Sequence, residues 1–164
     1  MNHKNDFFIS PTRGLLSFDG VIYDLVDYME SVRDAKYRVV VGTDSKTTEG
    51  RSNFVSVIVI HRIGHGARYF WQRVYEKRKF SLRERIYHEA SLSLALAEKL
   101  IERLNNALRN ERADYDFEIH VDIGKGGPTK EMIKEIVGMI AGNGFRVKTK
   151  PEAYGAFVVA DKHT

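Results

Sequence analysis

The sequence contains no cysteine among its 164 residues. Thiolate metal sites, cysteine nucleophiles and disulfide bonds are therefore excluded, and the composition fits a reducing compartment. Long apolar runs are also missing, because the longest one, around residues 54–60, is far too short to cross a bilayer. The N-terminal segment, MNHKNDFFIS, lacks the apolar centre of a secretion signal. We therefore expect a cytoplasmic protein with no membrane partner.

Two common catalytic motifs are absent as well. A zinc-protease HExxH motif beginning at His88 needs a second histidine where Leu92 stands. The glycine-rich segment 124–130, GKGGPTK, does not have the GxxxxGK[ST] spacing of a phosphate-binding P-loop. The six histidines show no zinc-ligand spacing. Neither a zinc protease nor a P-loop nucleotide hydrolase is indicated.

The composition is that of a globular chain. Apolar residues make up 43% and charged residues 29% of the sequence, with no repeat of fixed period. A chain of this length can bury about two-thirds of its unfolded surface without disulfide or metal support. We expect a single domain over residues 1–164, with an N-terminal extension and helix at about residues 1–35. Nothing in the sequence specifies an oligomeric state.

Hydrophobic periodicity and cap residues predict an α/β fold. Residues 1–16 are expected to be irregular, because Pro11 and Gly14 interrupt any pattern. Short loops join the first three strands, which predicts an antiparallel meander, and the later strand–helix–strand order predicts parallel pairing. The result is a five-stranded mixed sheet, three antiparallel strands and then two parallel ones, flanked by helices. The expected strands are 37–41, 53–62, 67–75, 117–122 and 145–150, and the expected helices are 17–32, 81–108 and 128–141.

Carboxylates follow two of the predicted strands. Asp44 comes directly after the apolar run 37–41 and its glycine, and Asp122 ends the later segment 117–122. Helical counting places Glu89 on the flank of the apolar stripe of helix 81–108, turned toward the sheet. A carboxylate in that position needs a partner or a metal ion, because an unpaired buried charge is costly. The acids of helix 17–32, Asp24, Asp27 and Glu30, are expected to form a solvated face.

Each of these acids also has a purely structural interpretation. Asp44 stands before a serine and Asp122 stands two residues before a glycine, which is ordinary turn chemistry. A neighbouring arginine could neutralise Glu89. His120 lies two residues before Asp122 and so shares its strand face, although a packed core histidine explains it equally well.

The net charge is +4, and the excess of basic residues is concentrated in residues 62–85. Basic side chains bind phosphates and aromatic rings stack on bases, so this segment is a candidate nucleic-acid surface. Large aromatics such as Trp71 more often belong to a core. The candidate contacts are Arg68, Arg73, Lys77, Arg78 and Lys79.

The order of these elements resembles the ribonuclease H-like fold. Six segments are similar to those of the YkuK family of ribonuclease H-like proteins, and together they extend over nearly the whole chain. They are FFISPTRG, VVGTDS, GARYF, HVDIG, GNGF and YGAFVVADKHT.

This resemblance implies a divalent-metal-dependent nuclease that hydrolyses RNA, DNA or their hybrid. Its metal ligands and catalytic residues would be Asp44, Glu89, Asp122 and Asp161, with Ser45, His120 and Lys162 close by. Mg²⁺ or Mn²⁺ is implied, because both prefer hard oxygen ligands and two such ions can clamp a phosphoryl displacement. The main alternative is a nucleic-acid- or ribosome-binding module on an inactive scaffold of the same fold. A nucleotide phosphotransferase related to actin is a third hypothesis, weakened by the short chain.

Overall fold

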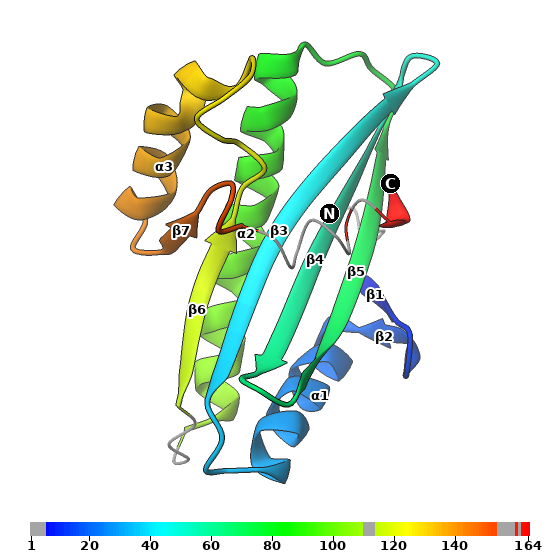
Figure 1. The fold of residues 1–164 in the computed structure, drawn as a ribbon. Helices are drawn as coiled ribbons and strands as arrows, with labels where there is room; N and C mark the ends of the chain where they lie inside the picture. The colour runs from blue at the N-terminus through cyan, green and yellow to red at the C-terminus, as the bar shows by residue number, and fades with distance from the viewer. Residues whose placement is uncertain (1–5, 110–113, 154–159, 161) are drawn as a thin grey trace.

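A computed structural model describes residues 6–109, 114–153, 160 and 162–164 (Figure 1). The strands are β1 (Phe7–Ser10), β2 (Gly14–Ser17), β3 (Tyr37–Thr48), β4 (Arg51–Arg62), β5 (Gly66–Glu76), β6 (Tyr115–His120) and β7 (Arg146–Lys148). The helices are α1 (Phe18–Ser31), α2 (Leu82–Ala107) and α3 (Ile133–Gly142), the last preceded by the 3-10 turn η2 (Lys130–Met132). None of the helices described is long and apolar enough to span a membrane.

The described strands form one mixed sheet in the order β2-β1-β5-β4-β3-β6-β7. β3, β4 and β5 are antiparallel neighbours, and β6 pairs in parallel with both β3 and β7. The predicted three antiparallel and two parallel strands are therefore confirmed. The predicted number of strands is wrong, because the sheet has seven rather than five.

The two additional strands come from the N-terminal segment that was expected to be irregular. β1 and β2 form a hairpin, and Ile9 of β1 pairs with Trp71 of β5. The interruption seen in the sequence is the hairpin turn itself, where Ser10 Oγ accepts backbone N–H bonds and Gly14 has a φ of 71°. Phe8 is buried against Phe18 at the start of α1, which fixes the hairpin on the core.

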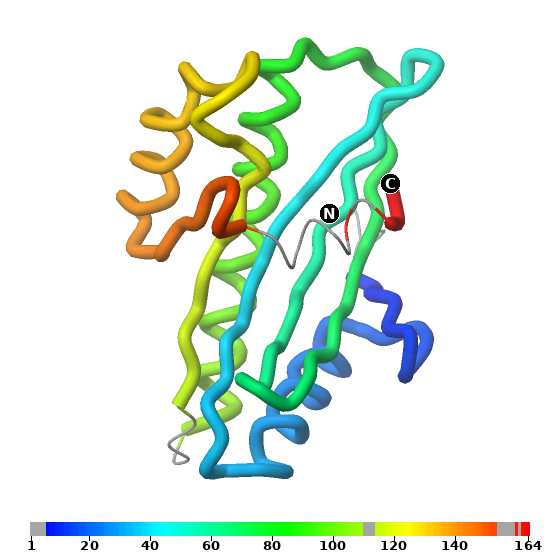
Figure 2. The backbone as a smooth tube through the Cα atoms, viewed as in Figure 1, coloured from blue at the N-terminus to red at the C-terminus, as the bar shows by residue number. Residues whose placement is uncertain are grey.

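β3 is longer than the sequence predicted. It does not stop at Gly42 but continues through Asp44, pairing with β4 residue by residue as far as Thr48↔Arg51. Glu49 and Gly50 then turn the chain, with φ values of 51° and 78°. Positive φ at both turn residues is the geometry that lets a tight hairpin follow the twist of its strands. Figure 2 shows β3 and β4 running together to this turn, so Asp44 lies inside a strand rather than at its end.

The helices pack on one face of the sheet, and a smaller cluster covers part of the other. Tyr37, Val39 and Val41 of β3 point into the main core with residues of α1, α2 and α3. On the opposite face Val55 and Val57 of β4 pack with Ala160, Tyr69 and Trp71. Side chains alternate along a strand, so even-numbered residues of β3 share this second face.

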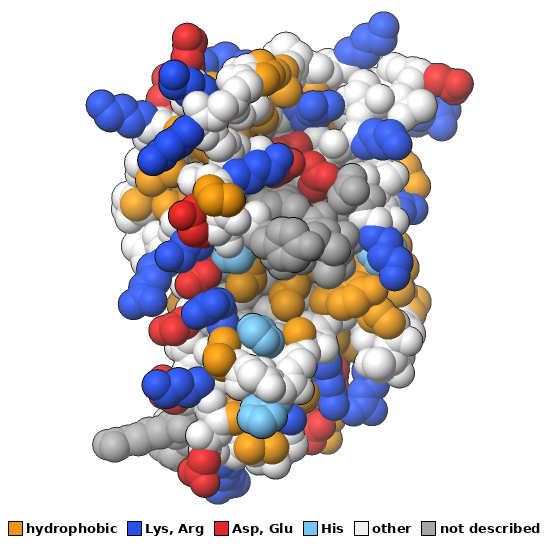
Figure 3. Space-filling view, in the orientation of Figure 1, with side chains coloured by type: hydrophobic (Ala, Val, Ile, Leu, Met, Phe, Trp, Pro, Cys, Tyr) orange, Lys and Arg blue, Asp and Glu red, His pale blue; other side chains and the backbone are white. Residues whose placement is uncertain are grey.

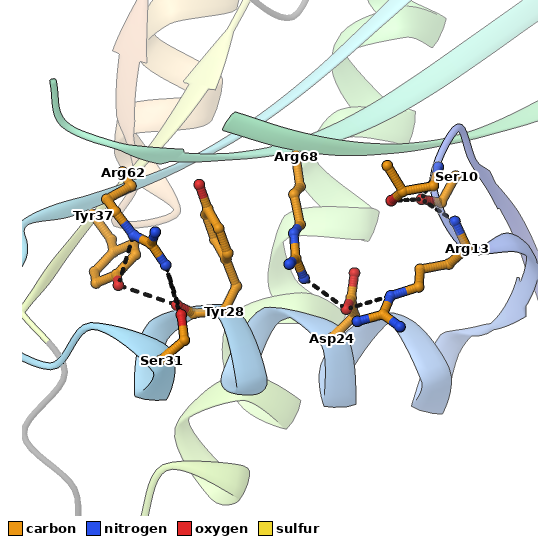
Figure 4. A network of polar contacts seen from close by, with 9 residues as sticks. Ser10, Arg13, Asp24, Tyr28, Ser31, Tyr37, Arg62 and Arg68 are labelled. Atoms are coloured by element: carbon orange, nitrogen blue, oxygen red, sulfur yellow. Dashed lines mark hydrogen bonds and ion pairs between the residues drawn. The ribbon is translucent and has the colours of Figure 1, made fainter. Parts of the chain in front are cut away.

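A polar network joins α1 to the sheet and corrects one prediction (Figure 4). Asp24 was expected on a solvated face, but it is buried and pairs with Arg13 at 3.2 Å and Arg68 at 2.9 Å. The reason is that α1 packs under β5, which brings Arg68 to the helix. Tyr28 lies between two guanidinium groups, with its ring centroid 4.5 Å from Arg68 Cζ and 4.1 Å from Arg62 Cζ.

Candidate functional site

The pairing of β3 and β6 brings two of the predicted acids together. The parallel register aligns Gly42 with His120, so two residues further along each chain it leads to Asp44 and Asp122. β6 ends at His120, but Val121 and Ile123 on either side of Asp122 belong to the main core, so Asp122, like Asp44 of β3, is assigned to the face opposite the helices. Each is only partly exposed. The strand-to-strand register thus accounts for a pair of carboxylates separated by almost half of the chain length.

Glu89 approaches the same end of the sheet from α2. It is buried, as helical counting predicted, and Ser45 Oγ donates a hydrogen bond to its Oε1. One turn later Ser93 Oγ donates to Thr43 Oγ1 at 2.8 Å. Glu89 and Ser93 are about 6 Å apart along the helix axis, and Ser45 and Thr43 are about 6.7 Å apart along the strand. The two spacings match, so both hydrogen bonds can form at once. α2 is thereby held in one rotation, with Glu89 against β3.

A capping box begins α2. Ser81 Oγ accepts the Glu84 N–H at 3.2 Å, and Glu84 Oε2 accepts the Ser81 N–H at 2.8 Å. This structural role occupies Glu84, whose pKa is lowered by the backbone bond from Ser81 and then by the Ser81 side chain. Glu89, one turn and a half further on, is the carboxylate of α2 that faces the sheet.

A small cavity connects Glu89 to Asp122. Its volume is about 10 Å³, near the lower limit for a single water molecule. Thr43, Glu89, Ser93 and Asp122 are its polar lining residues, and apolar residues such as Ile86 and Ile136 line the rest. The two residues therefore border one small cavity, although one comes from α2 and the other from the segment just after β6.

Burial and like charges together raise the pKa of Glu89 to about 8. The largest cause is burial, which disfavours the ionised carboxylate. The hydrogen bond from Ser45 and the charge of Arg85 act in the opposite direction, whereas Asp44 and Asp122 raise the pKa further. Glu89 is thus mainly protonated near neutral pH. Arg85 weakens this effect without cancelling it.

Lys150 is the residue at this site that sequence reasoning missed. Its Nζ lies 2.5 Å from Asp122 Oδ1, and contact with Asp122 and the nearby charge of Asp44 raise the lysine's pKa. The backbone N–H of Lys150 donates to the Ile123 carbonyl at 2.8 Å, which carries the chain alongside Asp122 beyond β7. A Cβ on Gly124 would lie 3.2 Å from Lys150 Cβ, so the glycine permits this close approach. The only sequence signal was that Lys150 is the last residue of the expected strand 145–150, which was to run parallel to its neighbours.

The donor chemistry suits a hard divalent cation, whereas the present arrangement contains an ammonium group instead. Asp122 Oδ1 is buried and makes no hydrogen bond of ordinary geometry to any residue described, only the ion pair with Lys150. Carboxylate oxygens are the preferred ligands of Mg²⁺ and Mn²⁺. Across residues 6–109, 114–153, 160 and 162–164, no three His, Asp or Glu side chains are grouped to hold one ion. Asp161 lies outside the described residues.

His120 contacts Glu118, whereas its position two residues before Asp122 suggested a contact near that aspartate. Its Nε2 lies 2.9 Å from Glu118 Oε2, and both side chains are buried on β6. Arg38 on the neighbouring β3 lies 3.5 Å from the other oxygen of Glu118. Burial lowers the pKa of His120, and the bond to Glu118 opposes that shift. His120 therefore belongs to a buried polar cluster next to the aspartates.

The structure separates the predicted basic residues. Arg68 points to α1 and pairs with Asp24, so it lies on the helix face. Arg73 lies on the opposite face, where it donates to the carbonyl of His163 and to the Tyr75 hydroxyl. Arg78 lies over the Phe80 ring at 4.0 Å, and Lys77, Lys79 and Lys162 are exposed. Figure 3 shows basic side chains gathered over the ends of β3 and β5, at the upper right of this face.

The comparisons with known proteins agree with this architecture. The family model described as "Ribonuclease H-like" matches residues 20–164. The chain is 30% identical over 168 aligned positions, 96% of each protein, to the uncharacterized protein YkuK of Bacillus subtilis (strain 168). No solved structure matches. The extent of the family match, together with the mixed sheet and its helical face, shows that the chain belongs to the ribonuclease H-like family.

Proposed function

We propose that this protein is a divalent-metal-dependent nuclease that hydrolyses phosphodiester bonds in nucleic acid. The observation that carries the proposal is the meeting of β3, β6 and α2 at one end of the sheet. Asp44 and Asp122 are brought to one face by strand register, and both lie close enough to Glu89 to raise its pKa. A carboxyl group whose pKa is raised strongly by burial, and further by neighbouring acids, is a candidate for a functional site.

The residues proposed to hold the ion are Asp44, Asp122 and Glu89, with Asp161 as the expected fourth ligand. A divalent ion at this position would stabilise the negative charge that develops on the phosphoryl oxygens. Asp44 lies in the paired strand β3, Asp122 lies just beyond β6 between two backbone hydrogen bonds to the chain around β7, and Glu89 lies on a capped helix. Ser45 orients the Glu89 carboxylate through its hydrogen bond. Glu89 must lose its proton before it can act as a ligand, which couples ion binding to pH.

The test is cleavage of labelled RNA, DNA and hybrid substrates by purified protein with Mg²⁺ or Mn²⁺. We expect Asp44→Asn to abolish cleavage while thermal unfolding stays close to that of the wild type. The matched control is Asp116→Asn, which changes an exposed acid on β6 that pairs with Arg146. Cleavage that survives Asp44→Asn, or that proceeds equally well in EDTA, would refute the proposal.

One observation favours a second candidate, a nucleic-acid-binding module without catalysis. Lys150 already supplies a positive charge to Asp122, which reduces the electrostatic need for a metal ion. This function predicts salt-sensitive binding that persists in EDTA and in Asp44→Asn, with no cleavage by the wild type. The same substrate panel therefore separates the two candidates.

A further inference from the structure

An open cleft of about 510 Å³ lies on the sheet where β3, β4 and β5 approach the hairpin turn. Its size is within the usual range for sites that bind small molecules or single nucleotides. A second hollow, of about 250 Å³, adjoins it and shares Arg51 and Tyr75. The cleft is lined by Lys46, Thr48, Glu49, Arg51, Asn53, Tyr75 and Thr164.

Strand register places this cleft beside the candidate active site. Lys46 follows Asp44 by two residues, so the two side chains share a face and are separated by about 7 Å along β3. Lys46 pairs with Asn53 of β4, which in turn pairs with Tyr75 of β5. The cleft is therefore one step along the same face from Asp44.

The cleft combines an exposed aromatic ring with cations. Tyr75 is 64% exposed, so much of its side chain is open to solvent. Arg73 donates to the Tyr75 hydroxyl at 3.1 Å, which fixes the direction of the ring. Lys46 lines the cleft with Tyr75, Lys77 lines the second hollow with Tyr75, and Arg51 lines both.

The neighbouring acids reduce this positive charge only in part. Glu76, which lines the second hollow, has its Oε1 2.7 Å from Nε2 of His88 on α2, and this contact holds its carboxylate toward the helix. Glu49 is at the hairpin turn, the outer limit of the cleft. The lining therefore presents cations around an oriented phenol ring, which is the chemistry that binds phosphates and stacks on an unpaired base.

We propose that this cleft binds one nucleotide of a single-stranded nucleic acid, next to the phosphate that the acids would cleave. The base stacks on Tyr75, and Lys46 with Arg51 contacts the flanking phosphates. Base stacking on a side chain needs a base face that is not covered by a neighbouring base, which selects single strands over duplexes. The inference rests on the proposed nuclease function for its position relative to Asp44, but its binding chemistry can be measured separately.

The experiment measures binding of fluorescent oligouridine and oligothymidine, about ten nucleotides long, by anisotropy in EDTA. We expect Tyr75→Ala to weaken binding by roughly ten- to a hundredfold, as for loss of one stacked base, and Tyr75→Phe to retain most of it. Tyr23→Ala is the matched control, since Tyr23 is a 74% exposed tyrosine on α1. Lys46→Gln should weaken binding and reduce the salt dependence by about one released ion.

Two results would overturn the inference. One is equal affinity of wild type and Tyr75→Ala, and the other is binding of a duplex as tight as that of the single strand. If Tyr75→Ala does not fold, as judged by circular dichroism, the double variant Lys46→Gln, Arg51→Gln decides instead, because unchanged affinity there also refutes the site. Tyr75-dependent binding without any metal-dependent cleavage would refute the nuclease and leave the cleft. Metal-dependent cleavage that does not change in Tyr75→Ala would refute the cleft as a nucleotide site and leave the nuclease.

Discussion

Replacing Glu89 with glutamine tests the electrostatics of the candidate site directly. The pKa of Glu89 is raised from 4.5 to about 8, mainly by burial. A shift of this size corresponds to about 5 kcal/mol, at about 1.4 kcal/mol for each pKa unit. The pKa of Glu89 is higher in the folded than in the unfolded state. The part of the unfolding free energy that depends on protonated Glu89 is therefore fully present below about pH 4.5 and is lost as pH rises through about 8. Wild-type stability should therefore fall across this window.

Glu89→Gln removes the titration and keeps the contact. The glutamine amide oxygen can still accept the hydrogen bond from Ser45, and the side chain has nearly the same volume. We expect the variant and the wild type to have similar unfolding free energies near pH 4.5. Their difference should then grow in favour of the variant, to at most about 5 kcal/mol above pH 8. Urea unfolding at a series of pH values measures this difference.

The control and the metal response sharpen the test. Glu98→Gln changes an exposed acid on the same helix, so its stability curve should run parallel to that of the wild type. Added Mn²⁺ should stabilise the wild type increasingly up to about pH 8, since ion binding requires ionised Glu89, and should have a smaller effect on Glu89→Gln. Parallel curves for Glu89→Gln and wild type between pH 4.5 and 8 would refute the reasoning.

Two further predictions concern the charges around α1 and β7. Lys150→Gln removes the ammonium group beside Asp122 and Asp44, so we expect Mn²⁺ to bind roughly three- to tenfold more tightly by calorimetry. Unchanged Mn²⁺ affinity would show that Lys150 does not compete for this site. Asp24→Asn leaves Arg13 and Arg68 without their buried carboxylate, and we expect a loss of about 2 kcal/mol in urea unfolding, whereas Asp27→Asn on the exposed face of α1 should have little effect.

The parts of the fold that could be predicted are those determined by local pattern. The Ser-x-x-Glu box fixed the start of α2, and counting at about 100° per residue turned Glu89 inward. Helical spacing could also have predicted that Asp24 is buried, since it lies on the same side of α1 as the buried residues Val21 and Tyr28. The wrong prediction came from reading an aspartate as solvated by default. Its partners Arg13 and Arg68 belong to elements that only the tertiary structure brings near.

The missed features depend on pairings between distant segments. The β1–β2 hairpin is too short to show periodicity, and it is stabilised by Phe8 packing on Phe18 and by pairing with β5. Lys150 reaches Asp122 because the chain beyond β7 continues beside β6 and Gly124 leaves room for it. Neither the pairing of β1 with β5 nor the contact of Lys150 with Asp122 follows from the spacing of residues along the sequence. Each joins segments that only the tertiary structure brings together.

The extra length of β3 is what gives the candidate site its organisation. Past Gly42, odd-numbered residues face the helices, where Thr43 and Ser45 hold α2 in place through Ser93 and Glu89. Even-numbered residues face the other way, where Asp44 follows the Gly42–His120 pair by two residues and Lys46 lines the cleft. Since side chains alternate strictly along a strand, a slip of one residue would exchange the two sets. The tight turn at Glu49 and Gly50 and the residue-by-residue pairing with β4 prevent this slip, so the register of one hairpin positions the acids and the proposed nucleotide contact together.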